Sequence, residues 1–370
     1  MYGLWYLTQM AGNNFEPRLE SLRGIAALVV AAHHGMSAFS GQVTDQAGVF
    51  GALVGWLLWI TNPGASVMFF FVLSGYVLGL ALERSGRFVP YVIRRAFRIL
   101  PMFILSVLFA YACVRMIRIE PLPSGLTEFF QLTFWPMPEV AQLIDNLTFQ
   151  SSSINGPSWS IYPEIIGSLF LPVLVFAHGF VAPRWRWGIF TVCAAALAFS
   201  DYRLVLWFYC GFFLPGEMAK LMTKPLTRLA TFVVGYLIIR YAGEYVVYFK
   251  FKTIAPSAIG ASMMIASVIS SHSFMAWLSF APLRFVGRVS YSFYLLHWPL
   301  FYLCWVAYTQ TFFQRGFVGN FLVCILSIVV ALAVSAITYG LIELPAMKLG
   351  TRISRWRPAM GRSSVAATTD

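Results

Sequence analysis

Residues 318–341 read VGNFLVCILSIVVALAVSAITYGL and contain no charged side chain. As an α-helix, which rises about 1.5 Å per residue, a stretch of this length covers about 36 Å, more than the hydrocarbon core of a bilayer at about 30 Å. The segment therefore predicts a transmembrane helix. Comparable apolar blocks, separated by short charged connectors, recur along the rest of the chain.

The composition of the whole chain points the same way. Of its 370 residues, 59% are hydrophobic and only 11% are charged, whereas a soluble domain carries about 25% charged residues. The alternation that marks transmembrane strands is absent, and helices satisfy their own backbone groups inside a bilayer. The sequence predicts an all-α fold, a polytopic transmembrane helical bundle, and excludes a soluble protein.

The charged connectors predict the orientation of the bundle, because Lys and Arg collect on the cytoplasmic side. With both termini cytoplasmic, most of the 26 Lys and Arg fall in cytoplasmic connectors. Topology thus explains the net charge of +12, and no nucleic-acid partner is expected. About ten spans are predicted, near residues 22–40, 64–82, 99–117, 158–180, 187–201, 203–219, 229–242, 255–271, 289–309 and 318–341.

The segments outside these spans have separate interpretations. Residues 50–60 form a short apolar run, which is typical of a re-entrant or interfacial piece. The connector 118–157 is long enough to be functional or structured rather than a spacer. A single domain is expected over residues 1–350, followed by a short polar cytoplasmic tail at 351–370. The five cysteines have no zinc-like spacing, so neither a metal site nor a disulfide is predicted.

Ionisable side chains inside predicted spans are functional candidates, because charge in a bilayer is costly. Arg23 and His34 are eleven positions apart, which places them within about 20° of one helix face and about 16 Å apart along its axis. The neighbouring His33 faces about 80° away from Arg23 on the same geometry. His34 is therefore a candidate general base that shares a cavity with Arg23. A purely structural hydrogen bond between helices is the alternative.

Arg94, Arg95 and Arg98 form a cluster at the start of the third span. Their i, i+3 and i, i+4 spacings let one helix face present several guanidinium groups, whose planar forks match phosphate. The alternative is ordinary positive charge on the cytoplasmic side of the membrane.

Three other motifs contain candidate residues. Glu164, in WSIYPEI, must pair or protonate, so it either orients His34 or forms an ion pair with an arginine. His297 lies beside a Trp-Pro pair and is interpreted as structural, and Glu343 lies at the inner end of the last span. The pair Ser74-Gly75 suits close helix packing; Ser74 lacks the GxSxG setting of a nucleophile.

Taken together, these elements resemble the membrane acyltransferase-3 family, multispanning enzymes that O-acylate sugars, polysaccharides and some secondary metabolites. The resemblance covers about residues 15–347. The matching elements are R-x10-H (Arg23 and His34), FFVLSGY (ending in Ser74, Gly75 and Tyr76), RRAFRILP (Arg94, Arg95 and Arg98), WSIYPE (Trp159, Ser160 and Glu164) and SYSFYLLHWP (including Ser290, Tyr291 and His297).

The resemblance implies an integral membrane O-acyltransferase. The donor would be cytoplasmic acyl-CoA, most often acetyl-CoA, a substrate rather than a bound cofactor. Its phosphates would lie on Arg23, Arg94, Arg95 and Arg98, and His34 would deprotonate an acceptor hydroxyl with support from Glu164. The acceptor would be a carbohydrate or glycan, or alternatively a small hydroxylated metabolite, and the location the inner membrane of a bacterium. A proton-coupled exporter is the competing class, and acyl-CoA consumption separates the two.

Overall fold

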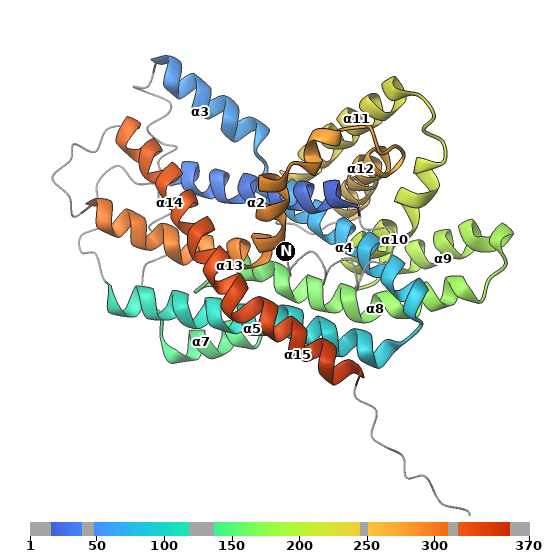
Figure 1. The fold of residues 1–370 in the computed structure, drawn as a ribbon, viewed down its shortest axis with the longest axis horizontal. Helices are drawn as coiled ribbons and strands as arrows, with labels where there is room; N and C mark the ends of the chain where they lie inside the picture. Colours follow the sequence, from blue (N-terminus) through green and yellow to red (C-terminus); the bar gives the residue numbers. More distant parts are fainter. Residues whose placement is uncertain (1–15, 39–47, 118–136, 245–250, 310–316, 356–370) are drawn as a thin grey trace, which may run out of the picture.

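The computed structural model describes residues 16–38, 48–117, 137–244, 251–309 and 317–355, and all regular secondary structure within these ranges is helical (Figure 1). The predicted all-α fold is confirmed for this part of the chain. The elements are α2 (Pro17–Ser37), α3 (Gly48–Ile60), α4 (Pro63–Ser85), α5 (Phe88–Met116), α7 (Val140–Leu147), η3 (Gly156–Ser160), α8 (Ile161–Gly179), η4 (Pro183–Trp185), α9 (Arg186–Ala198), α10 (Val205–Ala219), α11 (Pro225–Gly243), α12 (Phe251–Ile269), η6 (Ala276–Ser279), α13 (Ala281–Thr309), α14 (Phe317–Thr338), η7 (Tyr339–Glu343) and α15 (Leu344–Arg355).

Local signals set the ends of the helices. Asn62 caps α4, since its side chain accepts a hydrogen bond from the Ala65 amide at 2.8 Å, and Pro63 follows at the first helical position, where no amide donor is needed. Gly86 ends α4 in a left-handed conformation with φ of 56°, which glycine adopts without steric cost. The break at residues 61–62 separates α3 from α4, so the apolar run 50–60 is a helix of its own.

Four described stretches are long and apolar enough to cross a membrane: Gly51–Ser85, Phe88–Met116, Gly156–Gly179 and Val318–Arg355. Each of the ten segments predicted as spans contains a helix, whereas ten complete spans are not established. The helices α9 and α10 have 13 and 15 residues, fewer than the about 20 that a span needs. The predicted cytoplasmic termini lie outside the described residues at both ends.

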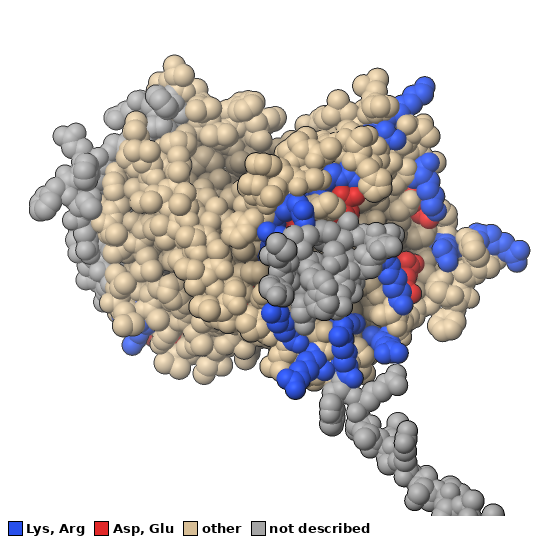
Figure 2. Space-filling model, viewed as in Figure 1, with Lys and Arg blue, Asp and Glu red and all other residues tan. Residues whose placement is uncertain are grey.

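The surface charge is divided between two halves of the molecule. Figure 2 shows Lys and Arg gathered on the side of α9 and the C-terminal end of α15, while the half over α13 and α14 shows almost no charge on this face. This segregation along the bundle is what a membrane protein requires, because apolar side chains face lipid and charges stay in water.

Glycines let the central helix α4 approach its neighbours closely. A Cβ atom added to Gly75 would lie 2.1 Å from the Phe208 carbonyl oxygen on α10, and one added to Gly211 would lie 2.0 Å from the Val72 oxygen on α4. The two helices therefore touch backbone to backbone, as small residues permit in membranes. Of the Ser74-Gly75 pair, Gly75 makes this close contact, whereas Ser74 lines a pocket on another side of α4.

The C-terminal end of the bundle differs from the predicted boundary at residue 350. Helix α15 continues to Arg355 and packs on α5, where a Cβ on Gly350 would lie 2.6 Å from the Phe97 side chain, and Thr351 is buried. An amphipathic helix is not visible as an apolar block, so the sequence pattern predicts a polar tail from residue 351, where the helix in fact continues for five more residues. Residues 356–370 of that tail lie outside the described ranges.

Candidate active site

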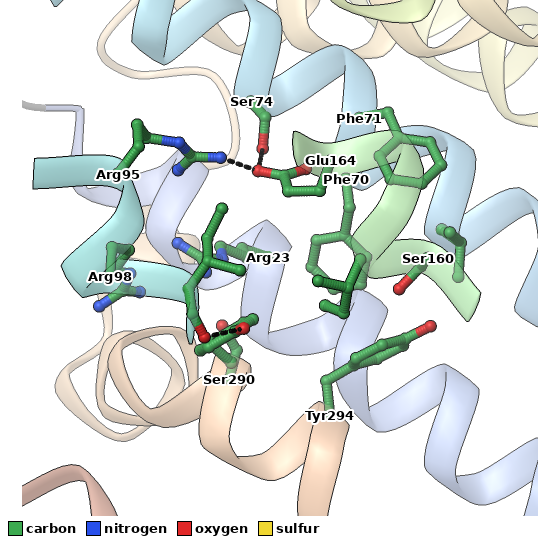
Figure 3. A pocket seen from close by; sticks show the side chains of 14 residues that line it. Arg23, Phe70, Phe71, Ser74, Arg95, Arg98, Ser160, Glu164, Ser290 and Tyr294 are labelled. Carbon is green, nitrogen blue, oxygen red and sulfur yellow. Dashed lines mark hydrogen bonds and ion pairs between the residues drawn. The ribbon is translucent and has the colours of Figure 1, made fainter. Parts of the chain in front are cut away.

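Five helices and the short η3 segment enclose a cavity of about 70 Å³ (Figure 3). Its wall is cationic on one side, where three arginines meet, and aromatic on the other. The lining residues are Arg23 from α2, Val67, Phe70, Phe71 and Ser74 from α4, Arg95, Arg98 and Ile99 from α5, Ser160 from η3, Ile161 and Glu164 from α8, and Ser290, Tyr291 and Tyr294 from α13.

Arg95 is held between two positions of α8 that are one turn apart. Its guanidinium forms an ion pair with Glu164 and donates to Ser168 Oγ from both Nε (3.2 Å) and Nη2 (2.9 Å). Ser74 Oγ donates to Glu164 Oε1 at 3.2 Å. Glu164 therefore takes the second of its two predicted interactions, the ion pair with an arginine, and no hydrogen bond joins it to His34 in the described structure. Ser168 lies in no recognisable sequence motif, so its role could not be predicted.

Arg98 is paired with the other predicted carboxylate. Its Nη1 forms an ion pair with Glu343, whose second oxygen accepts a hydrogen bond from Ser292 at 2.5 Å. The guanidinium carbon of Arg98 also lies 5.7 Å from the Tyr291 ring centre. Glu343 is fully buried at the end of η7, a single π-helical turn. Such turns re-aim a side chain within a longer helix and are common at functional sites.

Arg23 differs from these two arginines. It reaches into the pocket between Arg95 and Arg98 (Figure 3), close enough to both, and to Glu164 and Glu343, to interact electrostatically. Within the described ranges, however, it forms no hydrogen bond and no ion pair. Glu164 and Glu343 are each paired with another arginine, so Arg23 is the one of the three guanidinium groups that has no ion-pair partner among the described residues. A guanidinium offers five donors, so the pocket is suited to an anion.

His34 lies beyond the pocket rather than in its wall. Its Nδ1 is 3.0 Å from Nε2 of His297, and the two nearly parallel rings have centres 5.3 Å apart, as expected for rings joined by an in-plane hydrogen bond. The Trp298 ring is nearly perpendicular to that of His34, with centres 5.0 Å apart. Tyr294 connects the two regions, because it lines the pocket and its ring centre is 6.0 Å from that of His297. Arg23 lines this pocket and His34 does not, so the predicted common cavity for the two residues is not found. His33 points elsewhere and contacts the Thr61 carbonyl at 2.7 Å.

The sequence of the chain was compared with the models of known protein families. The acyltransferase 3 family, described as an acyltransferase domain, matches residues 16–340. The chain belongs to this family. It is accordingly a helical membrane protein and an acyltransferase. No curated protein and no solved structure matches the chain significantly.

The acyltransferase-3 match contains both helices that bring the histidines together. A Cβ on Gly24 would lie 2.6 Å from the Gly287 amide nitrogen, so α2 and α13 are in contact at this level. His34 and His297 each follow ten residues later, about 15 Å along either axis. The two helices therefore run parallel in a constant register, and this register places one imidazole against the other.

Pro299 shapes the same helix locally. A proline lacks an amide proton and leaves the carbonyl four residues earlier without its helical partner. That carbonyl belongs to Leu295, and it accepts a hydrogen bond at 3.1 Å from Asn155 Nδ2, which also donates to Ser106 Oγ at 3.1 Å. Asn155 is fully buried. Sequence reasoning missed it, although an Asn-Gly-Pro run before a span could have suggested a side chain that satisfies a kinked helix.

The remaining acyltransferase-3 motif residues frame the pocket. Ser160 is buried and donates to the Pro157 carbonyl at 3.1 Å, and Ser290 donates to the Gly287 carbonyl at 2.8 Å. Trp159 packs edge to face on Phe71. Two motif tyrosines, Tyr76 and Tyr291, are half-buried. The Tyr291 hydroxyl donates to the Ile99 carbonyl at 2.8 Å. Arg94, also predicted to bind donor phosphate, is not among the pocket-lining residues.

Proposed function

We propose that this membrane acyltransferase transfers an acyl group, in the first instance acetyl, from acyl-CoA to a hydroxyl group of a carbohydrate or glycan. The donor is a substrate, and no resident cofactor is required. The observation that carries the proposal is the guanidinium of Arg23, which has no ion-pair partner among the described residues and lines the same pocket as Arg95 and Arg98. A CoA molecule supplies phosphates that match such a cluster.

In this proposal the cationic and aromatic walls of the pocket bind different parts of the donor. The phosphates of the donor lie toward the three arginines, and the pantetheine arm extends past Phe70 and Tyr294 toward the histidines. Arg95 and Arg98 are already paired with carboxylates, which fixes their positions and lowers the cost of aligning them with a ligand. Their remaining donors supplement Arg23. The charged half of the surface in Figure 2 supports entry of the donor from the cytoplasm.

His34 acts as the general base in this proposal. It takes the proton of the acceptor hydroxyl, the hydroxyl oxygen forms a bond to the acyl carbon, and the carbon–sulfur bond breaks. The proton then passes from His34 to the departing thiolate, so that the products are an ester and free CoA. General acid–base catalysis of this kind contributes about 10² to 10⁴ in rate. Glu164 acts indirectly, by holding Arg95 in place.

Mass spectrometry of cells tests the proposal and names the acceptor. Cells that lack the gene are complemented with the wild-type chain or with His34→Ala, and their glycans and small metabolites are compared. We expect a product heavier by one acyl group only with the wild-type chain. Its mass gives the acyl length, and its class separates a glycan from a small hydroxylated metabolite. Identical acyl-ester profiles in both strains would contradict the proposal.

A further inference from the structure

The two histidines form a chain of hydrogen bonds whose direction can be assigned from one end. His297 Nδ1 lies 2.7 Å from the backbone carbonyl oxygen of Tyr294, one turn earlier in α13. A carbonyl can only accept, so the proton of this bond is on His297 Nδ1. In a neutral imidazole one nitrogen carries the proton and the other is an acceptor. Nε2 of His297 is therefore an acceptor, and it faces His34.

The next bond follows from the first. His34 Nδ1 is 3.0 Å from that acceptor nitrogen, so it must carry a proton to form a hydrogen bond. The neutral His34 ring then has its lone pair on Nε2. The order of donors is His34 Nδ1 to His297 Nε2, and His297 Nδ1 to the Tyr294 carbonyl.

We infer that His297 is a positioning residue for the acyl transfer, which holds His34 in the tautomer whose Nε2 is the base; the inference rests on the proposed function of His34. In base-assisted nucleophilic sites a third group, often a carboxylate, accepts from Nδ1 and fixes the ring in this manner. Here a neutral imidazole does so, and it is itself anchored by a backbone carbonyl. His297 has no exposed surface, and a neutral group avoids the cost of burying a carboxylate among aromatic rings.

The surroundings keep the chain in place. Phe301 packs its edge on His297 with ring centres 5.5 Å apart, and Trp298 packs its edge on His34. A Cβ added to Gly35, next to His34, would lie 2.4 Å from Cys324 Sγ, so α2 packs tightly against α14 at this level and cannot rotate freely. Rigid packing of this kind holds a base in one orientation.

Two substitutions of His297 separate positioning from packing. Glutamine places a carbonyl oxygen close to the position of Nε2 and can accept from His34, whereas leucine fills the space without an acceptor. We expect His297→Leu to lower kcat for acyl transfer by about 10²-fold or more with little change in the KM for acetyl-CoA. We expect His297→Gln to stay within about tenfold of the wild type. The matched control is His178→Leu, which removes another buried histidine, hydrogen-bonded to the Tyr209 hydroxyl at 2.6 Å outside the site.

Equal loss of kcat in the leucine and glutamine variants, or full activity of His297→Leu, would overturn the inference. A second measurement does not depend on turnover: ¹⁵N NMR of the histidine-labelled protein in nanodiscs, with signals assigned through variants of the five histidines. We expect His34 to be protonated at Nδ1 and His297→Leu to shift that population. A wild type that cleaves no thioester but shows this tautomer would refute the acyltransfer reaction proposed above and leave the hydrogen-bond assignment intact. A His34 signal protonated at Nε2 alone would refute the assignment.

Discussion

Replacing Arg23 by methionine should weaken binding of the donor without weakening the fold. Arg23 forms no hydrogen bond or ion pair with the described residues. Its removal therefore leaves no buried carboxylate without an ion-pair partner. Methionine keeps most of the apolar stem. A charge-assisted contact with phosphate is worth about 1.5–3 kcal/mol, which corresponds to about 10- to 150-fold in Kd.

Arg95→Met provides the matched comparison on the same pocket. It removes the partner of Glu164, and both side chains are largely buried, with 17% and 16% of their surfaces exposed. Breaking such a pair costs about 3 kcal/mol or more, which lowers Tm by about 4 °C or more for a protein of this size. We therefore expect Arg95→Met to lose both stability and donor affinity, while Arg23→Met keeps Tm within about 2 °C of the wild type.

The assay combines thermal unfolding with titration of CoA in nanodiscs at two salt concentrations. Salt should reduce the difference in affinity between wild type and Arg23→Met, because phosphate contacts are screened as ionic strength rises. An Arg23→Met protein that binds CoA as tightly as the wild type would refute the reasoning. So would a loss of Tm as large as that of Arg95→Met, since it would mean that Arg23 has a structural partner.

Three further predictions follow from particular contacts. His34→Ala should lower the acyl-transfer rate by about 10²- to 10⁴-fold while His33→Ala retains most activity; equal effects in a steady-state assay would contradict the assignment of the base. Gly75→Ala should cost at or above the upper end of the about 1–3 kcal/mol typical of overpacking, whereas Gly179→Ala, with open space around it, should leave Tm unchanged. Asn155→Leu leaves a buried carbonyl in the kinked helix without its donor, so unfolding in detergent should show a loss of about 1–3 kcal/mol; an unchanged Tm would argue against this role.

Much of the fold can be predicted from apolar length alone. Every predicted span contains a helix, because a block of apolar residues in a bilayer has few other ways to satisfy its backbone. The short helices are the weak point of this reasoning. Residues 187–201 and 203–219 are mostly apolar, yet their helices have only 13 and 15 residues and are shorter than a bilayer core is thick. Helix α15 was missed because it is not an apolar block. Only one of its faces is buried, and that face packs against α5.

The sequence names candidate residues for the site but not the contacts between them. Helix periodicity predicts different directions for His34 and His33, and the two side chains contact different partners, His297 and the Thr61 carbonyl. Spacing within one helix, however, carries no information about which side chain of another helix it meets. The pairing of Glu164 with Arg95, and of His34 with His297, depends on the register between helices far apart in sequence. That register is set by glycine contacts such as Gly24 with Gly287.

The most direct test of the account is release of free CoA thiol from acetyl-CoA by the purified chain in nanodiscs, with a cell extract of glycans and metabolites as acceptor. We expect release by the wild-type protein, saturating in acetyl-CoA, accompanied by an acylated product in the extract. His34→Ala should release no thiol above the background of empty nanodiscs, and Arg23→Met should require a higher concentration of acetyl-CoA. Wild-type protein that releases no more thiol than His34→Ala would contradict the central claim that this pocket transfers an acyl group from CoA.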